Sequence, residues 1–288
     1  MRSKLFVPGA RPDLFAKALA GDADALSFDL EDSVPETHKA QARADVAEFL
    51  RSPALIAAAK VLVVRVNALE TPHFEEDMHA VAQPSVALLN LPKVESADDI
   101  HAAVAVLERA ERANGIDRPI RLLATIETPR GLRLAASIAG AHPRVAGLQL
   151  GLADLFEPFG IDRRDPANVH ATLYAMRMAA AEAGVFAWDA AFADLEDADG
   201  FLAEASMARR LGYLGKSCIH PKQVALANQA FQPDAHEIDA ARRIVAAARQ
   251  AGAQGRGAFV VDGRMVDLPF LKRAEALLAS LDSDTGAP

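Results

Sequence analysis

The stretch "RLLATIETPRG" (residues 121–131) decides the fold, because a largely apolar run ends there in an ionisable carboxylate. Residues 121–126 have the composition of a buried strand, and Glu127 follows directly. A carboxylate that enters an apolar interior costs several kcal/mol unless it is paired, hydrogen-bonded or bound to a metal ion. Glu127 therefore either caps the helix that follows or points into a polar site, and the other strands distinguish these alternatives.

Short apolar runs alternate with longer alanine-rich segments along the chain. In the longer segments, such as 37–51, 96–113 and 168–183, apolar residues recur three or four positions apart, which is typical of helices. Eight strand–helix repeats without a Pro/Gly/Ser-rich linker predict an α/β fold, a (β/α)8 TIM barrel. The predicted strands are residues 4–9, 25–32, 60–67, 85–95, 121–128, 145–154, 185–190 and 213–221.

Polar residues follow the apolar start of most of these strands. In a parallel barrel the carboxyl ends of all strands meet on one face, where barrel enzymes build their active sites. A helix cap explains one such residue but not the series, so we expect Glu127 to point into a shared polar mouth. The residues at the strand ends are Asp29, Glu31, Asp32, Arg65, Asn67, Lys93, Glu95, Glu127, Asp154, Asp189, Lys216 and His220.

Beyond the eighth strand, the chain continues with further secondary structure. Residues 235–253 and 269–281 are expected to be helices, and Asp262-Gly263 between them is a two-residue hairpin signal. The tail "DSDTGAP" (282–288) is expected to fray.

This arrangement predicts two domains in a chain of 288 residues. Residues 1–231 form the catalytic barrel. Residues 232–288 form an extension that is larger than barrel closure requires, and we expect it to serve as an arm for a neighbouring subunit or as a lid.

Charge and cysteine content exclude several classes of function. A formal net charge of -8 argues against a nucleic-acid partner, because phosphate binding needs clustered Lys and Arg. The single cysteine, Cys218, excludes an intramolecular disulfide and suits a reducing cytosol. The start "MRSKLFVPGARPD" lacks a signal-peptide pattern and no long apolar run occurs, so we expect a cytoplasmic protein without a membrane span.

Acidic residues outnumber basic ones at the predicted mouth, which favours a bound cation. HExxH, CxxC and EF-hand patterns are absent from the sequence, which argues against the familiar zinc and calcium sites. Two carboxylates with open positions for water and substrate suit Mg²⁺ or Mn²⁺, and Glu127 and Asp154 follow neighbouring strands. Three other acids are expected mainly to hold the cations Arg65 and Lys93, with a direct metal ligand among them as the alternative. These acids are Asp29, Glu31 and Asp32.

Arg65 follows the run "VLVV" and raises the same question as Glu127 with the opposite charge. One role is an ion pair with Asp29 or Glu31. The other is to hold a substrate carboxylate or a developing oxyanion beside the metal, and the two roles are compatible.

In "GLADLF" (151–156), backbone N–H groups around Ala153 and Asp154 are expected to bind a substrate carboxylate. Lys216 or His220 could also reach the site, although a histidine before a proline is more often structural. GxGxxG, GxxxxGK[ST] and a Ser-His-Asp elbow are all absent from the sequence, which argues against dehydrogenase, P-loop and serine hydrolase chemistry.

The chain carries, in order, "RSKLFVPGARPD", "DLEDSVPETHKAQAR", "RVN", "LPKVE", "IETPRG", "GLADL", "KSCIHPKQ" and "DGRMVDLPFLKRA". This series, from Arg2 to about Ala274, resembles CitE-like proteins of the HpcH/HpaI aldolase and citrate lyase β-subunit superfamily. The resemblance implies a (β/α)8 barrel, Mg²⁺, and carbon–carbon bond cleavage or formation in CoA thioesters of 3-hydroxy acids. It also implies homotrimers or hexamers in which the C-terminal extension packs on a neighbouring subunit.

Matched by position, the resemblance makes Glu127 and Asp154 metal ligands and Arg65 a substrate-binding arginine. Asp267, in "MVDLP", matches an aspartate that works in the neighbouring subunit's site and would shuttle a proton. The expected reaction cleaves a 3-hydroxyacyl-CoA, such as malyl-CoA or citramalyl-CoA, to acetyl-CoA and a 2-oxo acid, or forms it from them. Charge and position alone suggest four residues for the CoA phosphates: Arg2, Lys4, Arg11 and Arg130.

The same residues leave other reactions open. A citrate lyase β subunit would act on a citryl carrier-protein thioester, and a malyl-CoA thioesterase would release free thiol without a 2-oxo acid. A CoA-independent aldolase for 4-hydroxy-2-oxo acids and a non-catalytic barrel are further alternatives.

Overall fold

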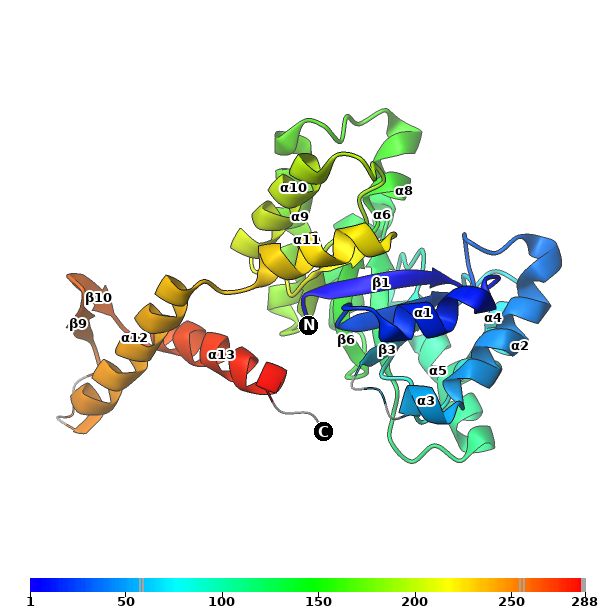
Figure 1. Cartoon of the computed structure of the whole chain (residues 1–288), viewed down its shortest axis with the longest axis horizontal. Coiled ribbons are helices and arrows are strands. Elements are labelled where there is room, and N and C mark those ends of the chain that lie inside the picture. Colours follow the sequence, from blue (N-terminus) through cyan, green and yellow to red (C-terminus); the bar gives the residue numbers. More distant parts are fainter. Residues whose placement is uncertain (57, 59, 254, 256, 286–288) are drawn as a thin grey trace. The chain divides into compact units, whose positions relative to one another are not determined.

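The computed structural model describes residues 1–56, 58, 60–253, 255 and 257–285. Within these ranges the chain forms an eight-stranded parallel sheet, of which β1, β3 and β6 are labelled in Figure 1. The strand order is β7-β6-β5-β4-β3-β2-β1-β8. Each strand but the last thus pairs with its predecessor or successor in the chain, as successive strand–helix units require. The strands are β1 (Ser3–Pro8), β2 (Ala25–Asp29), β3 (Val61–Arg65), β4 (Leu88–Leu91), β5 (Arg121–Ile126), β6 (Val145–Leu150), β7 (Phe186–Trp188) and β8 (Lys216–Cys218).

The two edges of this sheet, β7 and β8, meet and close it into a barrel. Asp189, directly after β7, forms a parallel bridge with Lys216. The Asp189 N–H donates to the Gly215 carbonyl at 2.9 Å, and the Ser217 N–H donates to the Asp189 carbonyl at 3.2 Å. The predicted (β/α)8 barrel is therefore confirmed.

Helices surround the barrel and pack on one another in chain order. α2 packs on α4, α4 on α5, α5 on α7 and α7 on α9, while α10 packs on α11. α5 shows how the sequence sets their limits: Ser96 and Asp99 form a reciprocal capping box at its start, and Gly115 ends it with φ 66°. The helices are α1 (Phe15–Ala20), α2 (Lys39–Leu50), α3 (Pro53–Ile56), α4 (Phe74–Val81), α5 (Ala97–Asn114), α6 (Pro129–Arg133), α7 (Ala135–Ala139), α8 (Leu152–Phe156), α9 (Pro166–Glu182), α10 (Ala198–Arg210) and α11 (Pro221–Phe231).

Two apolar clusters hold the barrel together. The larger one fills the space between the sheet and the helices. The smaller one includes Val63 and Leu88, which are in register on β3 and β4. Val63 lies two residues before Arg65 and so faces the same side of β3, which places an apolar layer inside the barrel beneath the polar mouth.

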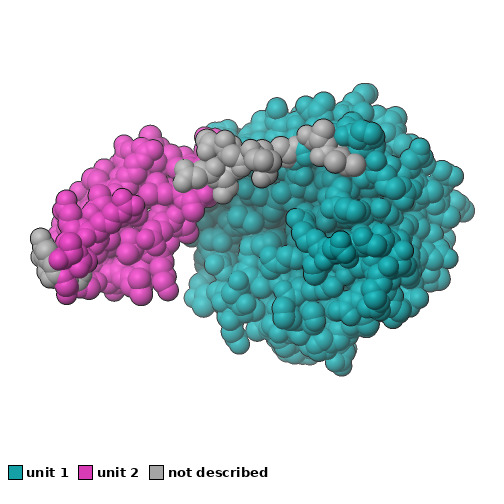
Figure 2. All heavy atoms as spheres, turned by 90° about the horizontal axis from the view of Figure 1, so that it is seen from below, with its two compact units in different colours: residues 1–231 teal, residues 232–288 magenta. Residues whose placement is uncertain are grey.

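The chain divides into two compact units, residues 1–231 and 232–288, coloured teal and magenta in Figure 2. The second unit contains α12, α13 and an antiparallel hairpin. Asp262 and Gly263 both have positive φ, at 50° and 77°, as a type I′ hairpin turn requires. Its elements are α12 (Ala235–Ala253), β9 (Phe259–Val261), β10 (Arg264–Val266) and α13 (Leu268–Thr285).

The predicted elements differ from the observed ones mainly at their ends. The strand expected at 85–95 is only four residues long, Leu88–Leu91, because the polar residues after it leave the sheet. The tail expected to fray from residue 282 instead continues α13 to Thr285, and residues 286–288 lie outside the described residues. Within the described ranges, no helix is both long enough and apolar enough to cross a bilayer.

Candidate active site

Arg65 is fixed at the mouth by a two-point ion pair. It is in register with Asp29 of β2. Its Nε and Nη2 donate to Asp29 Oδ1 and Oδ2 at 2.6 and 2.8 Å, the geometry that suits a planar guanidinium. Burial alone would raise the pKa of Asp29, but the Arg65 charge and hydrogen bonds outweigh it and hold that pKa below its usual value.

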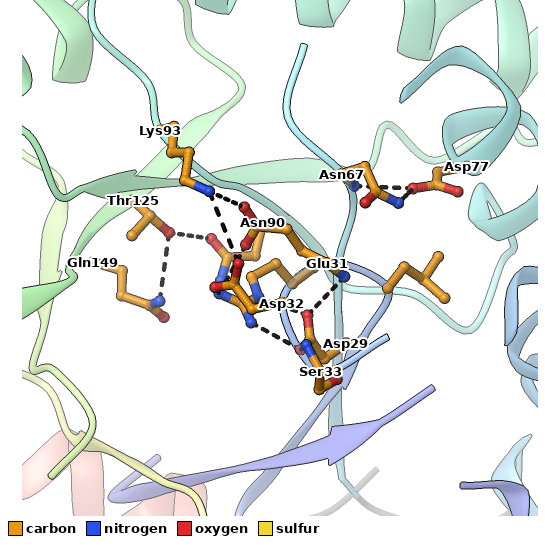
Figure 3. Close-up of polar contacts among 12 residues, drawn as sticks. Asp29, Glu31, Asp32, Ser33, Asn67, Asp77, Asn90, Lys93, Thr125 and Gln149 are labelled. Atoms are coloured by element: carbon orange, nitrogen blue, oxygen red, sulfur yellow. Dashed lines mark hydrogen bonds and ion pairs between the residues drawn. The ribbon is translucent and has the colours of Figure 1, made fainter. Parts of the chain in front are cut away.

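Glu31 and Asp32 link Arg65 to Lys93, and Figure 3 shows Lys93 beside these two acids. Arg65 Nη1 lies 2.9 Å from Glu31 Oε2 and 3.2 Å from Asp32 Oδ2. Lys93 Nζ donates to Glu31 Oε1 at 2.9 Å. The acids that follow β2 therefore hold two cations in place, and this arrangement leaves the guanidinium of Arg65 at the edge of the mouth.

Glu127 lies just past the end of β5 and is only 3% exposed. It accepts the Lys93 backbone N–H at 2.6 Å, a contact that the left-handed backbone of Lys93 (φ 53°) makes possible. Burial raises the pKa of Glu127 to about 8, and the negative charges of Glu31 and Asp154 add to the effect. Burial and the nearby negative charges thus disfavour the ionised form of Glu127. A bound cation would compensate for that cost, so the carboxylate is suited to hold one.

Gly151 provides the space that Glu127 occupies. A Cβ atom on Gly151 would lie 2.5 Å from Glu127 Oε2 and 2.6 Å from its Cβ. No other residue type fits there without displacing the carboxylate, so this glycine is required by close approach.

Asp154 lies in the first turn of α8 and is exposed. Within the described part of the chain it makes no hydrogen bond or ion pair, so its carboxylate is available. The first bond of α8 runs from the Leu155 N–H to the Gly151 carbonyl at 3.2 Å, so the N–H groups of Ala153 and Asp154 precede it.

The donor set fits a hard divalent cation. Within the described ranges no group of three or more His, Cys, Asp or Glu side chains is arranged to hold a metal ion. Glu127 and Asp154 would therefore supply two carboxylates, with water and substrate oxygens completing the sphere. Mg²⁺ is commonly held in this way.

Two strand-end residues, Asp189 and Lys216, lie outside the mouth, contrary to expectation. Lys216 and Asp189 pair at 2.7 Å with both side chains fully buried, and Lys216 also contacts Glu204 of α10 at 2.7 Å. These two side chains point toward α10 rather than into the barrel. β7 and β8 have only three residues each, so their sequence pattern is too short to show this direction. Asn67 lines the same pocket as Glu31, Asp32 and Lys93, but its bonds to the buried Asp77 give it a structural role there.

The prediction that four basic residues bind the CoA phosphates is wrong for two of them, Arg2 and Lys4. Arg2 is bound to Asp24, which precedes β2 and so lies at the face opposite the mouth. Lys4 is 1% exposed inside the barrel. Arg11 and Arg130 are exposed, so for these two residues the prediction stands.

Lys39 is a residue of the site that the sequence reasoning missed. Its Nζ donates to the carbonyls of Leu30 and Glu31 at 2.8 and 2.7 Å and to Asn67 Oδ1 at 2.6 Å. It thereby fixes the loop that carries the acids of the mouth. The signal was present in "DLEDSVPETHKAQAR". Lys39 begins a helix there but does not contribute to the apolar face of that helix.

Asp267 belongs to the second unit and immediately precedes α13. Its carbonyl accepts the Leu271 N–H at 3.1 Å. Its side-chain Oδ1 is buried and has no hydrogen-bond partner among the described residues.

A family model described as HpcH/HpaI aldolase/citrate lyase matches residues 2–221. The chain belongs to this family. An L-malyl-CoA/β-methylmalyl-CoA lyase of Cereibacter sphaeroides is 36% identical over 298 residues, covering 96% of this chain and 93% of that protein. The citrate lyase subunit β of Escherichia coli is 36% identical over 280 residues, with coverage of 96% and 92%.

A solved structure of the family has the same fold. CitE from Mycobacterium tuberculosis, in complex with magnesium, acetoacetate and coenzyme A, matches with a TM-score of 0.74 and 33% identity. The match covers 96% of this chain and 97% of that one.

Proposed function

We propose that this protein is a Mg²⁺-dependent carbon–carbon lyase. It cleaves a 3-hydroxyacyl-CoA, the class to which malyl-CoA and citramalyl-CoA belong, to acetyl-CoA and a 2-oxo acid, or forms it from them. The observation that carries the proposal is the pairing of Glu127, buried and with a raised pKa, with the available carboxylate of Asp154 beside a fixed Arg65. The named lyases among its relatives support it.

Glu127 and Asp154 would hold the metal ion, as the magnesium in the related CitE structure supports. When bound there, Mg²⁺ supplies Lewis-acid polarisation of the substrate's hydroxyl and carboxylate oxygens. The backbone N–H groups of Ala153 and Asp154 would bind the carboxylate of the 2-oxo-acid half and orient it.

Arg65 would stabilise the oxygen on which negative charge develops. Its grip on Asp29 holds the guanidinium in place before substrate arrives, so little reorganisation is needed during the reaction. Glu31 and Lys93 would support this geometry rather than contact the reacting atoms.

Asp267 would move the proton, as a base in condensation and as an acid toward the enolate in cleavage. We assign it to the active site of a neighbouring subunit in a homotrimer or hexamer. The unpartnered Oδ1 of Asp267 supports a partner outside the described contacts. A cytoplasmic location completes the proposal, because a single buried cysteine fits a reducing compartment.

The direct test incubates the purified chain with malyl-CoA and citramalyl-CoA in the presence and absence of Mg²⁺. Mass spectrometry should detect acetyl-CoA together with a 2-oxo acid, and chelation should abolish both products. Free CoA without a 2-oxo acid would identify a thioesterase instead and contradict the lyase proposal.

The shared site is tested by mixing two inactive variants, Glu127→Gln and Asp267→Asn, and letting their subunits exchange. Sites that combine an intact mouth with an intact arm should regain part of the wild-type rate. If mixed oligomers form but remain inactive, Asp267 does not serve a neighbour.

A second candidate is a citrate lyase β subunit that acts on a citryl carrier-protein thioester. The 36% identity to the Escherichia coli subunit, equal to that with the malyl-CoA lyase, supports this second candidate. Activity that requires an acyl carrier protein and is absent with CoA thioesters would select this function.

A further inference from the structure

A row of buried polar side chains crosses the barrel beneath the site, and the proposed chemistry uses none of them. Lys4 on β1, Gln149 on β6, Thr125 on β5 and Asn90 on β4 are each at most 4% exposed. Thr125 lies two residues before Glu127 and faces the same side of the chain, so the row lies one layer below the proposed metal carboxylates.

Hydrogen bonds join this row in one direction. Lys4 Nζ donates to Gln149 Oε1. Gln149 Nε2 then donates to Thr125 Oγ1 at 3.4 Å, and Thr125 Oγ1 donates to Asn90 Oδ1 at 2.7 Å (Figure 3). A threonine hydroxyl has one proton, so once it accepts from Gln149 it must give that proton to Asn90. Asn90 therefore turns its oxygen toward Thr125 and leaves its Nδ2 as a donor.

That donor has nothing to bind. Asn90 Nδ2 is buried and lacks a hydrogen-bond partner within the described residues. β4 lies between β3, which carries Arg65, and β5, which leads to Glu127. Asn90 is in register with Arg65, and Arg65 leans the other way, toward Asp29. The unpaired N–H thus lies inside the barrel, on the strand between the one that carries Arg65 and the one that leads to Glu127.

The other end of the row, Lys4, lies close to two aromatic rings. Within the described chain, Lys4 forms no ion pair, and its Nζ lies 4.8 Å from the ring centre of Phe6 and 5.7 Å from that of Trp188. Arg65 lies on the same Phe6 ring, at 5.1 Å. Burial lowers the pKa of Lys4, and the Arg65 charge adds to this. The row thus ends at Asn90 in an unpaired donor, which is complementary to an oxygen atom.

We propose that the Asn90 amide binds the 2-oxo-acid half of the substrate and selects acids whose substituent on the carbonyl carbon carries an oxygen atom. This inference rests on the proposed lyase function and ranks its substrates: the acids from malyl-CoA and citramalyl-CoA, with hydrogen and methyl substituents, are accepted but are less favoured than acids with an oxygen-bearing substituent. The substituent is the group that varies among 2-oxo acids once their carboxylate and carbonyl are held above, at Glu127 and Asp154. A hydrogen or methyl substituent leaves the Asn90 donor unpaired, whereas a hydroxyl or carboxylate substituent accepts its proton.

The test compares three acids that differ only in this substituent: pyruvate, hydroxypyruvate and oxaloacetate. Their kcat/KM for condensation with acetyl-CoA is measured, and their Kd in the presence of Mg²⁺ is measured by calorimetry without acetyl-CoA. Asn90→Leu removes the donor, and Thr125→Val breaks the row while Asn90 remains. Thr172→Val is the matched control, because it removes a buried hydroxyl bonded at 3.0 Å to the Asn168 carbonyl within α9.

Wild type should prefer the two oxygen-bearing acids over pyruvate. That preference should fall about tenfold in Asn90→Leu and severalfold in Thr125→Val, and it should be unchanged in Thr172→Val. An equal loss for all three acids, or an unchanged preference in Asn90→Leu, would overturn the inference and indicate that a water molecule occupies the donor.

The binding measurement separates this inference from the proposed function. If wild type turns over its substrates but the preference does not respond to Asn90→Leu, the inference alone fails. If turnover is absent but the calorimetric preference follows Asn90, selection stands and the lyase reaction fails. If wild type binds none of the acids, both are overturned.

Discussion

Lowering the pH should weaken Mg²⁺ binding steeply, because Glu127, the proposed ligand, must lose a proton before it can bind the ion. Burial and the charges of Glu31 and Asp154 raise the pKa of Glu127 to about 8. At this value about 1% of Glu127 is ionised at pH 6 and about half at pH 8. The apparent affinity for Mg²⁺ should therefore rise about fiftyfold between these two pH values and level off above them.

Calorimetric titration at pH 6, 7 and 8, in buffers of different ionisation enthalpy, measures both the affinity and the protons released. Close to one proton should be released per ion at pH 6. Glu127→Gln can still accept the Lys93 N–H, and it should bind Mg²⁺ weakly with a flat pH profile. Asp154→Asn should also bind weakly but keep a rising profile. Wild-type affinity that is constant from pH 6 to pH 8, without proton release, would refute the reasoning.

Three further outcomes are expected. Arg65→Lys should keep the fold by circular dichroism and lose about tenfold or more in kcat/KM, because an ammonium cannot replace a planar fork; a loss below about threefold would leave Arg65 only its ion pair. Gly151→Ala should weaken Mg²⁺ binding in titrations by displacing Glu127, and wild-type affinity would contradict the close approach. Lys216→Met leaves two buried carboxylates facing each other and should lower the free energy of unfolding by about 3–5 kcal/mol in urea titrations; an unchanged midpoint would contradict this.

The raised pKa of Glu127 also predicts how the stability of the metal-free protein changes with pH. Between pH 4.5 and about 8 an unfolded Glu127 is ionised, whereas the folded protein retains its proton. The folded state therefore binds more protons in this window, and this group's contribution to stability falls as the pH rises. Urea titrations of the metal-free protein should show that fall reduced in Glu127→Gln; identical slopes in both proteins would argue that Glu127 titrates normally.

The sequence predicted the barrel and much of its mouth because both depend on patterns within single strands. The apolar run before Glu127 and the polar residues after β2 are local signals. The side of the sheet to which each side chain points was harder to predict. β8 has only three residues, too few to show on which face Lys216 lies. Lys4 looked like a surface charge, because its partners Gln149 and Trp188 come from strands far along the chain. Such contacts follow from register and closure, which the sequence does not display locally.

Barrel closure has a consequence for the order in which the molecule opens. Each of β1 to β7 can pair with a strand adjacent in the chain, but β8 must return to β1, joining Ser3–Leu5 to Lys216–Cys218. Contacts so distant in sequence carry the largest loop-closure cost and form slowly. Amide hydrogen exchange should therefore enter the barrel at the seam formed by β1 and β8, where we expect the lowest local stability. β3, which carries Arg65, and β5, which leads to Glu127, lie away from that seam, so the barrel can open there while these two side chains keep their positions.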